Sequence, residues 1–304
     1  MLFFDLLPLW FSQQFGSQQL ARNPETNTVT NTTANVIQYD QVMTTKLAVA
    51  YAAGLTIVHC CRTPIQGGAA IDLACGPGHY TLCLARYLGY QQITGIDLAS
   101  NMITTASRNA HQQGLGDRVD FRVGDITRLD DVAEGVLDLA SFTDASHHMP
   151  DLQSVSQVLR EMERIAKPSG LVMVMDLVRL RTAELTERYV NLLGADYIQR
   201  GLPAFFQDFR NSMYAAWTVQ ELRQTIPDIT NRYWCHLVPR GLPTIQIIVG
   251  LPIGRKKIFL RSDFPWTKEQ NPVAQEMRSD WKMLYWSLFW GSRRMIAPRR
   301  HSDQ

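Results

Sequence analysis

The sequence lacks the features that mark several specialised classes of protein. Its five cysteines include no CxxC pair, so neither a disulfide framework nor a zinc–cysteine cluster is expected, and a cytoplasmic location is predicted. No apolar run reaches the roughly 18 residues of a membrane span. Asp5 and Pro8 interrupt the apolar start, which is unlike a secretory signal peptide. The formal net charge is only +2, so the overall charge does not indicate nucleic-acid binding.

The remaining composition is typical of a globular protein with one large core. Of the 304 residues, 45% are hydrophobic and 19% are charged. Charge is distributed unevenly, because residues 1–251 hold 19 Lys/Arg and 23 Asp/Glu, whereas residues 252–304 hold 11 and 5. We therefore expect a mildly acidic body and a basic C-terminal extension.

The sequence pattern divides the chain into four regions. Residues 1–35 are rich in Gln, Asn, Thr and Ser and are predicted to be a flexible leader. Residues 36–251 are predicted to form the main domain. Within it, aromatic helices at about 180–217 are predicted to cover a binding site as a lid, although their aromatic residues could equally form only the helices' own core. Residues 252–304 form a basic, aromatic extension.

Inside the main domain, strand-like runs alternate with helical spacing, which predicts an α/β fold with a parallel, doubly wound sheet. One or two helices are expected in residues 36–59, ahead of the first strand. The predicted strands are 69–73, 92–96, 119–123, 136–142 and 171–175, and the helices between them are 80–88, 101–113 and 152–165. Residues 167–170 are expected to form the turn before the last of these strands, and Thr218 with Glu221 is expected to form a capping box that opens a further helix. Two further strand-like runs, 232–238 and 244–251, flank a Pro/Gly connection and predict an antiparallel hairpin at the end of the sheet.

The turn after the first predicted strand carries the strongest chemical signal. Asp72 closes the strand, and Gly76 and Gly78 allow the backbone to turn tightly against a ligand, ahead of a helix N-terminus with free N–H groups. A dinucleotide fingerprint would need a third glycine where Thr81 stands. The turn therefore favours a ligand with a charged amino-acid portion and a ribose over a pyrophosphate.

Two more carboxylates close the next predicted strands. Asp97 ends the second strand and can accept hydrogen bonds from both ribose hydroxyls, and Asp125 ends the third, where it can accept from an adenine amino group. Each aspartate could instead cap the following helix. Three consecutive strands that end in Asp, together with the glycine turn, favour the ligand site.

These motifs resemble the core of the class I S-adenosylmethionine-dependent methyltransferases across residues 69–176. The segments Asp97–Met102 and His147–Asp151 are most similar to the subgroup of quinone-ring and small-molecule methyltransferases. The resemblance implies a Rossmann-like, mostly parallel sheet of seven strands in the order 3-2-1-4-5-7-6, with a helical lid and a C-terminal helical tail. It also implies S-adenosylmethionine as the cofactor and methyl transfer to a small, largely apolar or aromatic molecule.

Three alternatives to this function stay open. The first is a peripheral-membrane methyltransferase that acts on a lipid or quinone, and the second is a non-catalytic module that binds the cofactor. The third is an enzyme that uses the same fold for cyclisation or rearrangement. Strand four is not followed by the Asn-Pro-Pro-Tyr type of motif that holds planar amine nitrogens, which argues against nucleobase methylation and a nucleic-acid partner.

The resemblance also implies which residues contact the cofactor. Gly76 and Gly78 approach the methionine portion, Asp97 holds the ribose, and an aromatic residue from the leading helices covers the site. The expected set is Tyr39, Asp72, Ala74, Cys75, Gly76, Gly78, Asp97, Leu98, Met102, Asp125, Ile126, Phe142 and Thr143.

His147 and His148 follow the fourth strand, where this family faces its substrate, and Asp176 closes the fifth. A neutral imidazole is suited to removing a proton from an acceptor near neutral pH. Asp176 is the candidate for orienting the substrate or the base. Packing and capping roles remain the alternatives for all three. Asp144 and Asp151 are too sparse to predict a metal site, and no metal is expected.

The C-terminal extension contains an apolar stripe at helical spacing, between an N-cap-like Asn271 and a predicted stop at Gly291. The stripe consists of Val273, Met277, Trp281, Leu284 and Leu288, and Arg293, Arg294, Arg299 and Arg300 follow it. Residues 271–300 could lie on an anionic membrane surface, dock on the body of the protein, or dock on a second subunit in a homodimer. The sequence leaves these three roles open.

Overall fold

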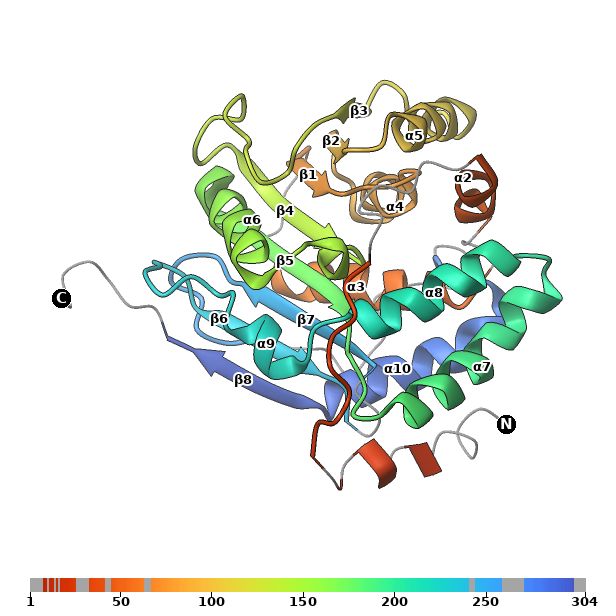
Figure 1. Ribbon diagram of the computed structural model, residues 1–304. Helices are drawn as coiled ribbons and strands as arrows, with labels where there is room; N and C mark the ends of the chain where they lie inside the picture. The colour runs from red at the N-terminus through yellow and green to blue at the C-terminus, as the bar shows by residue number, and fades with distance from the viewer. Residues whose placement is uncertain are drawn as a thin grey trace.

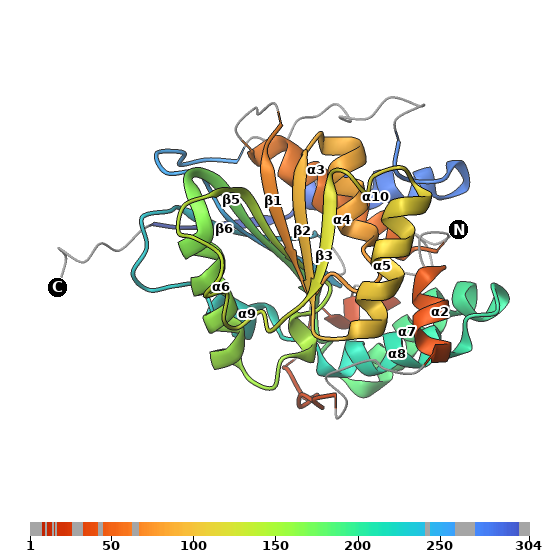
Figure 2. The same ribbon diagram turned by 90° about the horizontal axis from the view of Figure 1, so that it is seen from above.

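The computed structural model describes residues 8–9, 11–13, 15, 17–25, 33–41, 45–62, 67–240, 244–258 and 271–297. They build one sheet with helices on both faces (Figures 1 and 2). The eight strands are β1 (Ala69–Leu73), β2 (Gln92–Asp97), β3 (Val119–Val123), β4 (Leu137–Thr143), β5 (Ala166–Leu177), β6 (Trp234–Val238), β7 (Ile245–Gly250) and β8 (Ser292–Ile296).

The strand order is β3-β2-β1-β4-β5-β7-β6-β8. Strands β1 to β5 run parallel, whereas β7 is antiparallel to β5 and β6 is antiparallel to β7. The predicted order of seven strands is therefore confirmed. The predicted number is wrong by one, because β8 adds an eighth strand beside β6, with Met295 opposite Cys235.

Helices cover the sheet in two layers, and Figure 2 shows α3, α4, α5 and α10 on one face and α6 and α9 on the other. The helices are α2 (Thr33–Asp40), α3 (Leu47–Cys61), α4 (His79–Leu88), α5 (Ser100–Gln112), α6 (Leu152–Ile165), α7 (Ala183–Gln199), α8 (Pro203–Ala215), α9 (Val219–Arg223) and α10 (Arg278–Phe289). Helices α7 and α8 lie beyond the carboxyl ends of the parallel strands, where binding sites of such sheets occur. No helix among the described ranges is long and apolar enough to cross a bilayer.

Local signals explain where several helices begin. Asp151 caps α6, because its Oδ1 accepts a hydrogen bond from the backbone N–H of Ser154 at 2.7 Å. Pro203 stands in the first turn of α8, where its missing N–H has no cost. Thr218 and Glu221 form the predicted capping box of α9, which is confirmed.

The segment before the fifth predicted strand differs from its prediction. Residues 167–170 were expected to form a turn before a strand at 171–175, but they are an extended part of β5, and the pairing with β4 shifts between Leu137 and Leu139. Arg232 explains the difference. Its buried guanidinium donates to the carbonyls of Ala166, Lys167 and Gly170 at 2.6–3.1 Å and holds the segment against the sheet.

The C-terminal extension docks on the body of the protein. The apolar side chains Val273, Met277 and Trp281 are buried against α3. Helix α10 begins at Arg278, so the N-cap predicted at Asn271 is wrong; Asn271 Oδ1 instead accepts from the N–H of Val273 in a preceding turn.

The chain leaves α10 through Gly291, where a Cβ would lie 2.2 Å from the carbonyl oxygen of Val238. Only glycine allows this approach, which starts the pairing of β8 with β6. Arg299 and Arg300 lie outside the described residues.

Part of the predicted leader also contacts the body. Residues 17–25 run across the end of β5 and past α8 (Figure 1). Gln18 Nε2 donates to the carbonyl of Leu180 at 3.0 Å, and the N–H of Asn23 donates to that of Tyr214 at 3.1 Å. Val42 and Met43, expected within the leading helices, lie outside the described residues.

Candidate active site

The glycine turn after β1 has the left-handed backbone that its sequence suggests. Gly76 has φ +52° and Gly78 has φ +81°, and Ala74 also has a positive φ of +53°. A Cβ on Gly76 would meet no atom within 4 Å, whereas a Cβ on Gly78 would lie 2.6 Å from Cζ of Phe121. Gly76 therefore faces open space at the turn, and Gly78 permits the packing of α4 against β3.

Asp97 is fixed beside this turn. Its Oδ2 accepts from the N–H of Gly76 at 2.9 Å and its Oδ1 accepts from the N–H of Ala99 at 2.8 Å. Burial raises the pKa of Asp97, although these N–H groups act in the opposite direction. The carboxylate joins the turn to the end of β2, and each oxygen keeps a further lone pair for a ligand hydroxyl.

Asp72 holds the turn from inside the protein. Its side chain is fully buried and accepts hydrogen bonds from Thr81 Oγ1 at 2.6 Å and Ser141 Oγ at 2.9 Å. Burial raises the pKa of Asp72 to about 6. Thr81 stands at the position where a dinucleotide fingerprint has glycine. Its hydrogen bond to Asp72 therefore links α4 to β1.

The expected adenine contacts lie along the same strand ends. Leu98 is 56% exposed, and Met102 and Ile126 are buried. Asp125 is exposed and its Oδ1 accepts from the N–H of Thr127 at 2.9 Å. An exposed apolar side chain beside buried ones provides a surface for a planar ring.

Three other residues predicted to contact the cofactor have less exposed side chains. Cys75 and Thr143 are buried beside the turn and at the end of β4. Phe142 is fully buried in the core between the sheet and α6, so its side chain does not face the site, and only its backbone is near the strand end.

The two histidines follow β4 in a single 3-10 turn (Ser146–His148), and His147 is locked to Asp176. Nδ1 of His147 donates to Asp176 Oδ1 at 2.7 Å, and its backbone N–H donates to Oδ2 at 2.8 Å. Ser146 Oγ also donates to Oδ2. Burial would lower the pKa of His147, but the charge and hydrogen bond of Asp176, together with Asp144, raise it to about 9.

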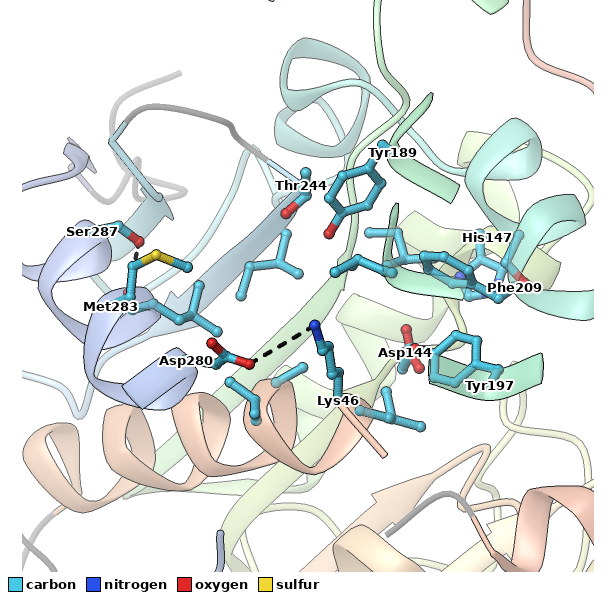
Figure 3. A pocket seen from close by; sticks show the side chains of 18 of the residues that line it. Lys46, Asp144, His147, Tyr189, Tyr197, Phe209, Thr244, Asp280, Met283 and Ser287 are labelled. Atoms are coloured by element: carbon cyan, nitrogen blue, oxygen red, sulfur yellow. Dashed lines mark hydrogen bonds and ion pairs between the residues drawn. The ribbon is translucent and has the colours of Figure 1, made fainter. Parts of the chain in front are cut away.

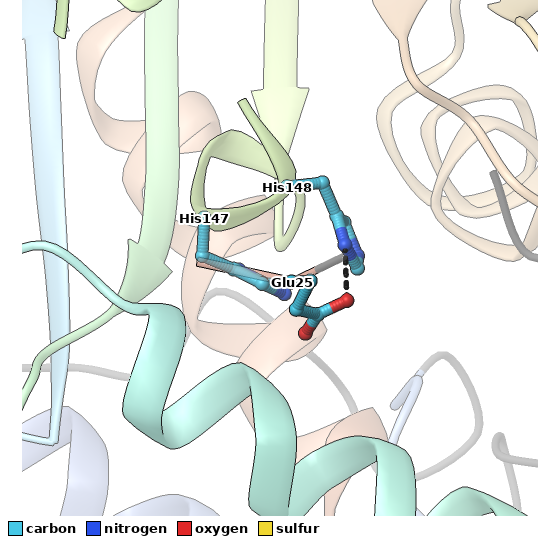
Figure 4. Close-up of side chains that lie close together, drawn as sticks. All are labelled: Glu25, His147 and His148. Carbon is cyan, nitrogen blue, oxygen red and sulfur yellow. Dashed lines mark ion pairs between the residues drawn. The ribbon is translucent and has the colours of Figure 1, made fainter. Parts of the chain in front are cut away.

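His148 is paired with Glu25, which comes from residues 17–25. Nδ1 of His148 lies 2.8 Å from Glu25 Oε2, and Ser212 Oγ of α8 donates to Oε1 at 2.9 Å (Figure 4). Burial would raise the pKa of Glu25, but His148 and His147 lower it. The N-terminal segment thereby connects the histidine turn to α8.

Arg22 strengthens the same connection. Its guanidinium donates to the carbonyls of His147, Met149 and Pro150 at 2.7–3.0 Å and to that of Ala215 at 2.7 Å. It also stacks on the ring of Trp217, 3.7 Å from the ring centre.

A cavity of about 750 Å³ opens beside the histidine turn (Figure 3). Most of its wall is apolar and aromatic, from α7, α8 and α10: Tyr189, Leu193, Tyr197, Phe205, Phe209, Met283, Leu284, Trp286 and Trp290. Asp144 and His147 lie at one end, and the ion pair between Lys46 and Asp280, at 3.9 Å, lies at another. The cavity has the size and lining of a site for an apolar small molecule.

Tyr39 lines this cavity and also packs against residues near the end of β2, where the cofactor is expected. Its ring packs edge-on against Phe205, with ring centres 5.0 Å apart, and against the buried Met102. Its hydroxyl donates to Asp208. Tyr39 lines the cavity, so it contacts the acceptor side as well as the side on which it was expected.

Several residues that shape the site were not predicted. Glu25 and Arg22 lie in the expected leader, Asp208 lies among the lid aromatics, and Lys46 precedes α3. Asp144 was not predicted to be a metal ligand. It has a left-handed φ of +53° and lines the cavity. No local motif marks these positions, because each enters the site only through the arrangement of distant segments.

Comparisons with known proteins agree with the geometry. Residues 71–174 match the family described as methyltransferase domain. The chain is 31% identical over 148 residues to the ubiquinone biosynthesis O-methyltransferase of Methylococcus capsulatus. The matched region makes up 49% of this chain and 58% of that protein. The chain is 32% identical over 114 residues to the demethylmenaquinone methyltransferase of Desulfitobacterium hafniense, with 37% and 44% covered. The chain thus spans about half the length of these curated relatives.

A solved structure supports the fold. A proposed S-adenosyl-L-methionine-dependent methyltransferase from Methanococcus maripaludis superposes with a TM-score of 0.52 at 19% identity, covering 79% of this chain and all of that one. At this identity the likeness concerns the fold alone.

Proposed function

Because this chain carries a class I methyltransferase domain, we propose that it is an S-adenosylmethionine-dependent methyltransferase acting on a small, largely apolar or aromatic molecule. The proposal rests on the open turn at Gly76 beside the fixed carboxylate of Asp97, together with a large apolar cavity that reaches Asp144 at the end of β4. The names of the relatives, which concern quinone biosynthesis, support an acceptor of this class.

The residues at the glycine turn fit the cofactor. The backbone at Gly76 leaves room for the amino-acid portion, Asp97 is placed to accept from the ribose hydroxyls, and Leu98 offers an apolar surface for adenine. When bound, S-adenosylmethionine supplies an activated methyl group on a sulfonium. The remaining chemistry is alignment of the acceptor and exclusion of water.

The aromatic walls of the cavity exclude water and hold the acceptor, with its reacting atom directed at the histidine turn. The polar cluster there would take up the proton of an acceptor hydroxyl. We propose that His147 and His148 are the catalytic side chains that contact this hydroxyl. Asp176 holds the ring of His147 in its orientation.

Calorimetry with S-adenosylmethionine tests the cofactor assignment. The wild-type protein should bind one equivalent, and Asp97→Asn should weaken binding at least tenfold, because the amide no longer accepts from both N–H groups and the ribose. Asp120→Asn is the matched control, since Asp120 is exposed on β3. An absence of heat with folded wild-type protein would refute the proposal.

The acceptor is found with cofactor that carries a labelled methyl group. Mass spectrometry of extracts incubated with enzyme and labelled cofactor should reveal a labelled apolar product. Cofactor binding without any labelled product would favour the non-catalytic alternative.

One observation favours the lipid or quinone alternative within the same reaction. Trp286 and Trp290 line the cavity and are 37% and 63% exposed, so the cavity rim carries aromatic side chains of the kind found at membrane surfaces. Sedimentation with anionic vesicles, lost in the double variant Trp286→Ser/Trp290→Ser, would support it.

A further inference from the structure

Three side chains that can bind metals converge beside the cavity, where His147 forms part of its wall: Glu25, His147 and His148 (Figure 4). One ligand atom from each lies within 4.8 Å of the other two. Glu25 comes from the N-terminal segment, and the histidines come from the turn after β4. Two imidazoles and one carboxylate suit a borderline divalent metal such as Zn²⁺ better than Mg²⁺, which prefers oxygen ligands.

His147 and Glu25 each have one atom in a hydrogen bond outside the cluster. Each keeps one further atom that can coordinate a metal. His147 uses Nδ1 for Asp176, which leaves Nε2, and its ring is directed at Glu25 in Figure 4. Glu25 Oε1 accepts from Ser212, which leaves Oε2. Histidine ligands of metals commonly donate their other ring N–H to a carboxylate in this way.

His148 supplies Nδ1, a buried nitrogen that lies 2.8 Å from Glu25 Oε2. A cation coordinated by both atoms would satisfy the nitrogen and the carboxylate together.

Negative charge around the cluster also favours a cation. Asp144 and Asp176 form a second group with His147, within the same distance limit, and the charge of Asp208 acts on the same histidines. The guanidinium of Arg22 directs its hydrogen bonds to backbone carbonyls rather than to these carboxylates.

We propose that Glu25 Oε2, His147 Nε2 and His148 Nδ1 bind one divalent transition-metal ion, with Zn²⁺ as its representative. Its role in the reaction depends on the function proposed above. The ion holds the acceptor's oxygen at an open coordination position and lowers the pKa of its hydroxyl. The proton passes to Asp144, which lines the same cavity, and the histidines act on the acceptor through the metal.

Calorimetric titration of chelator-treated protein with Zn²⁺ alone tests the site. We expect one ion per chain for the wild type, and at least tenfold weaker binding for Glu25→Gln and for His148→Asn. Glu134→Gln and His111→Asn are matched controls on exposed residues, and both should bind as the wild type does. Mg²⁺ should bind at least tenfold more weakly than Zn²⁺.

A Co²⁺ spectrum excludes the five buried cysteines as an alternative site. Binding at the proposed cluster gives d–d absorption without a thiolate charge-transfer band, whereas a thiolate band would overturn the proposal. No Zn²⁺ binding by the wild type, or equal binding by Glu25→Gln and His148→Asn, would also overturn it. S-adenosylmethionine binding is measured on the same samples, so that failure of the metal site and failure of the proposed function are distinguished.

Discussion

The two halves of the site are built in different ways. The proposed cofactor side consists of the turn after β1 and the ends of β2 and β3, all within residues 72–126 and on adjacent parallel strands. The proposed acceptor side takes side chains from the N-terminal segment, the histidine turn, α7, α8 and α10, and these segments span most of the chain. The cofactor half is thus a local unit, whereas the acceptor half exists only when distant segments are docked.

This contrast predicts that damage to the docked segments should spare cofactor binding. Trp281→Ala removes a fully buried indole between α10 and α3 and should lower the free energy of unfolding by about 3–5 kcal/mol. Denaturant titration measures the loss, and calorimetry at a temperature where the variant is folded should show unchanged S-adenosylmethionine affinity.

Trp290→Ala is the matched control for Trp281→Ala. Trp290 is 63% exposed, so its removal should change stability by less than about 0.5 kcal/mol. Equal losses in the two variants would show that α10 is not docked as described.

The reverse damage should affect the cofactor half. Gly78→Ala forces a Cβ into Phe121 at a left-handed φ, so we expect the turn to shift and the Kd for S-adenosylmethionine to rise about 100-fold. Gly116→Ala is the control, because a Cβ there meets no atom within 4 Å. Wild-type affinity in Gly78→Ala would contradict the assignment of this turn to the cofactor.

Arg22→Ala sharpens the comparison at the N-terminal segment. The variant leaves four backbone carbonyls without their guanidinium partner and should lose about 1–3 kcal/mol. Hydrogen exchange should become faster in residues 17–25 and in the histidine turn, and remain unchanged in β1 and β2. Arg128→Ala, on an exposed ion pair, serves as the control.

His236 provides the smallest expected effect, in neither half of the site. Burial and the neighbouring Arg223 lower the pKa of His236 to about 4, and its Nδ1 accepts from Arg223 Nε at 3.3 Å. The unfolded chain, with a pKa of about 6.5, binds a proton that the folded protein does not. The free energy of unfolding should therefore fall as the pH is lowered from about 6.5 to 4.

Comparison of the wild type with His236→Gln isolates this contribution from other groups. The wild type should lose about 1 kcal/mol more than the variant between pH 6.5 and 5.5. The contribution of Asp72 to the pH dependence of stability has the opposite sign. Its pKa is raised to about 6 in the fold, so the stability that it contributes at low pH is lost as the pH rises through that value. It is present in both proteins and cancels. Parallel pH profiles would show that His236 is not neutral in the fold.

The sequence predicted the parts of the molecule whose residues are neighbours in the chain. The strand–turn–helix at Asp72–Gly78 and the capping box at Thr218 depend on short-range backbone geometry and on hydrophobic patterns, and both are readable from the chain. The strand order followed only from the resemblance to the methyltransferase family. The extended segment before Leu171 was missed, because a guanidinium from Arg232 holds it there. The strand β8 was missed, because its short, arginine-containing sequence forms a strand only where β6 offers a free edge.

The sequence by itself determined the α/β sheet, the glycine turn and the carboxylate at Asp97, because a parallel sheet always gathers its strand ends at one edge. Only the tertiary structure decided that Glu25 joins His147 and His148, and that α10 closes the acceptor cavity. Contacts between segments so far apart depend on how the whole chain buries its apolar surface, and no local pattern records that outcome.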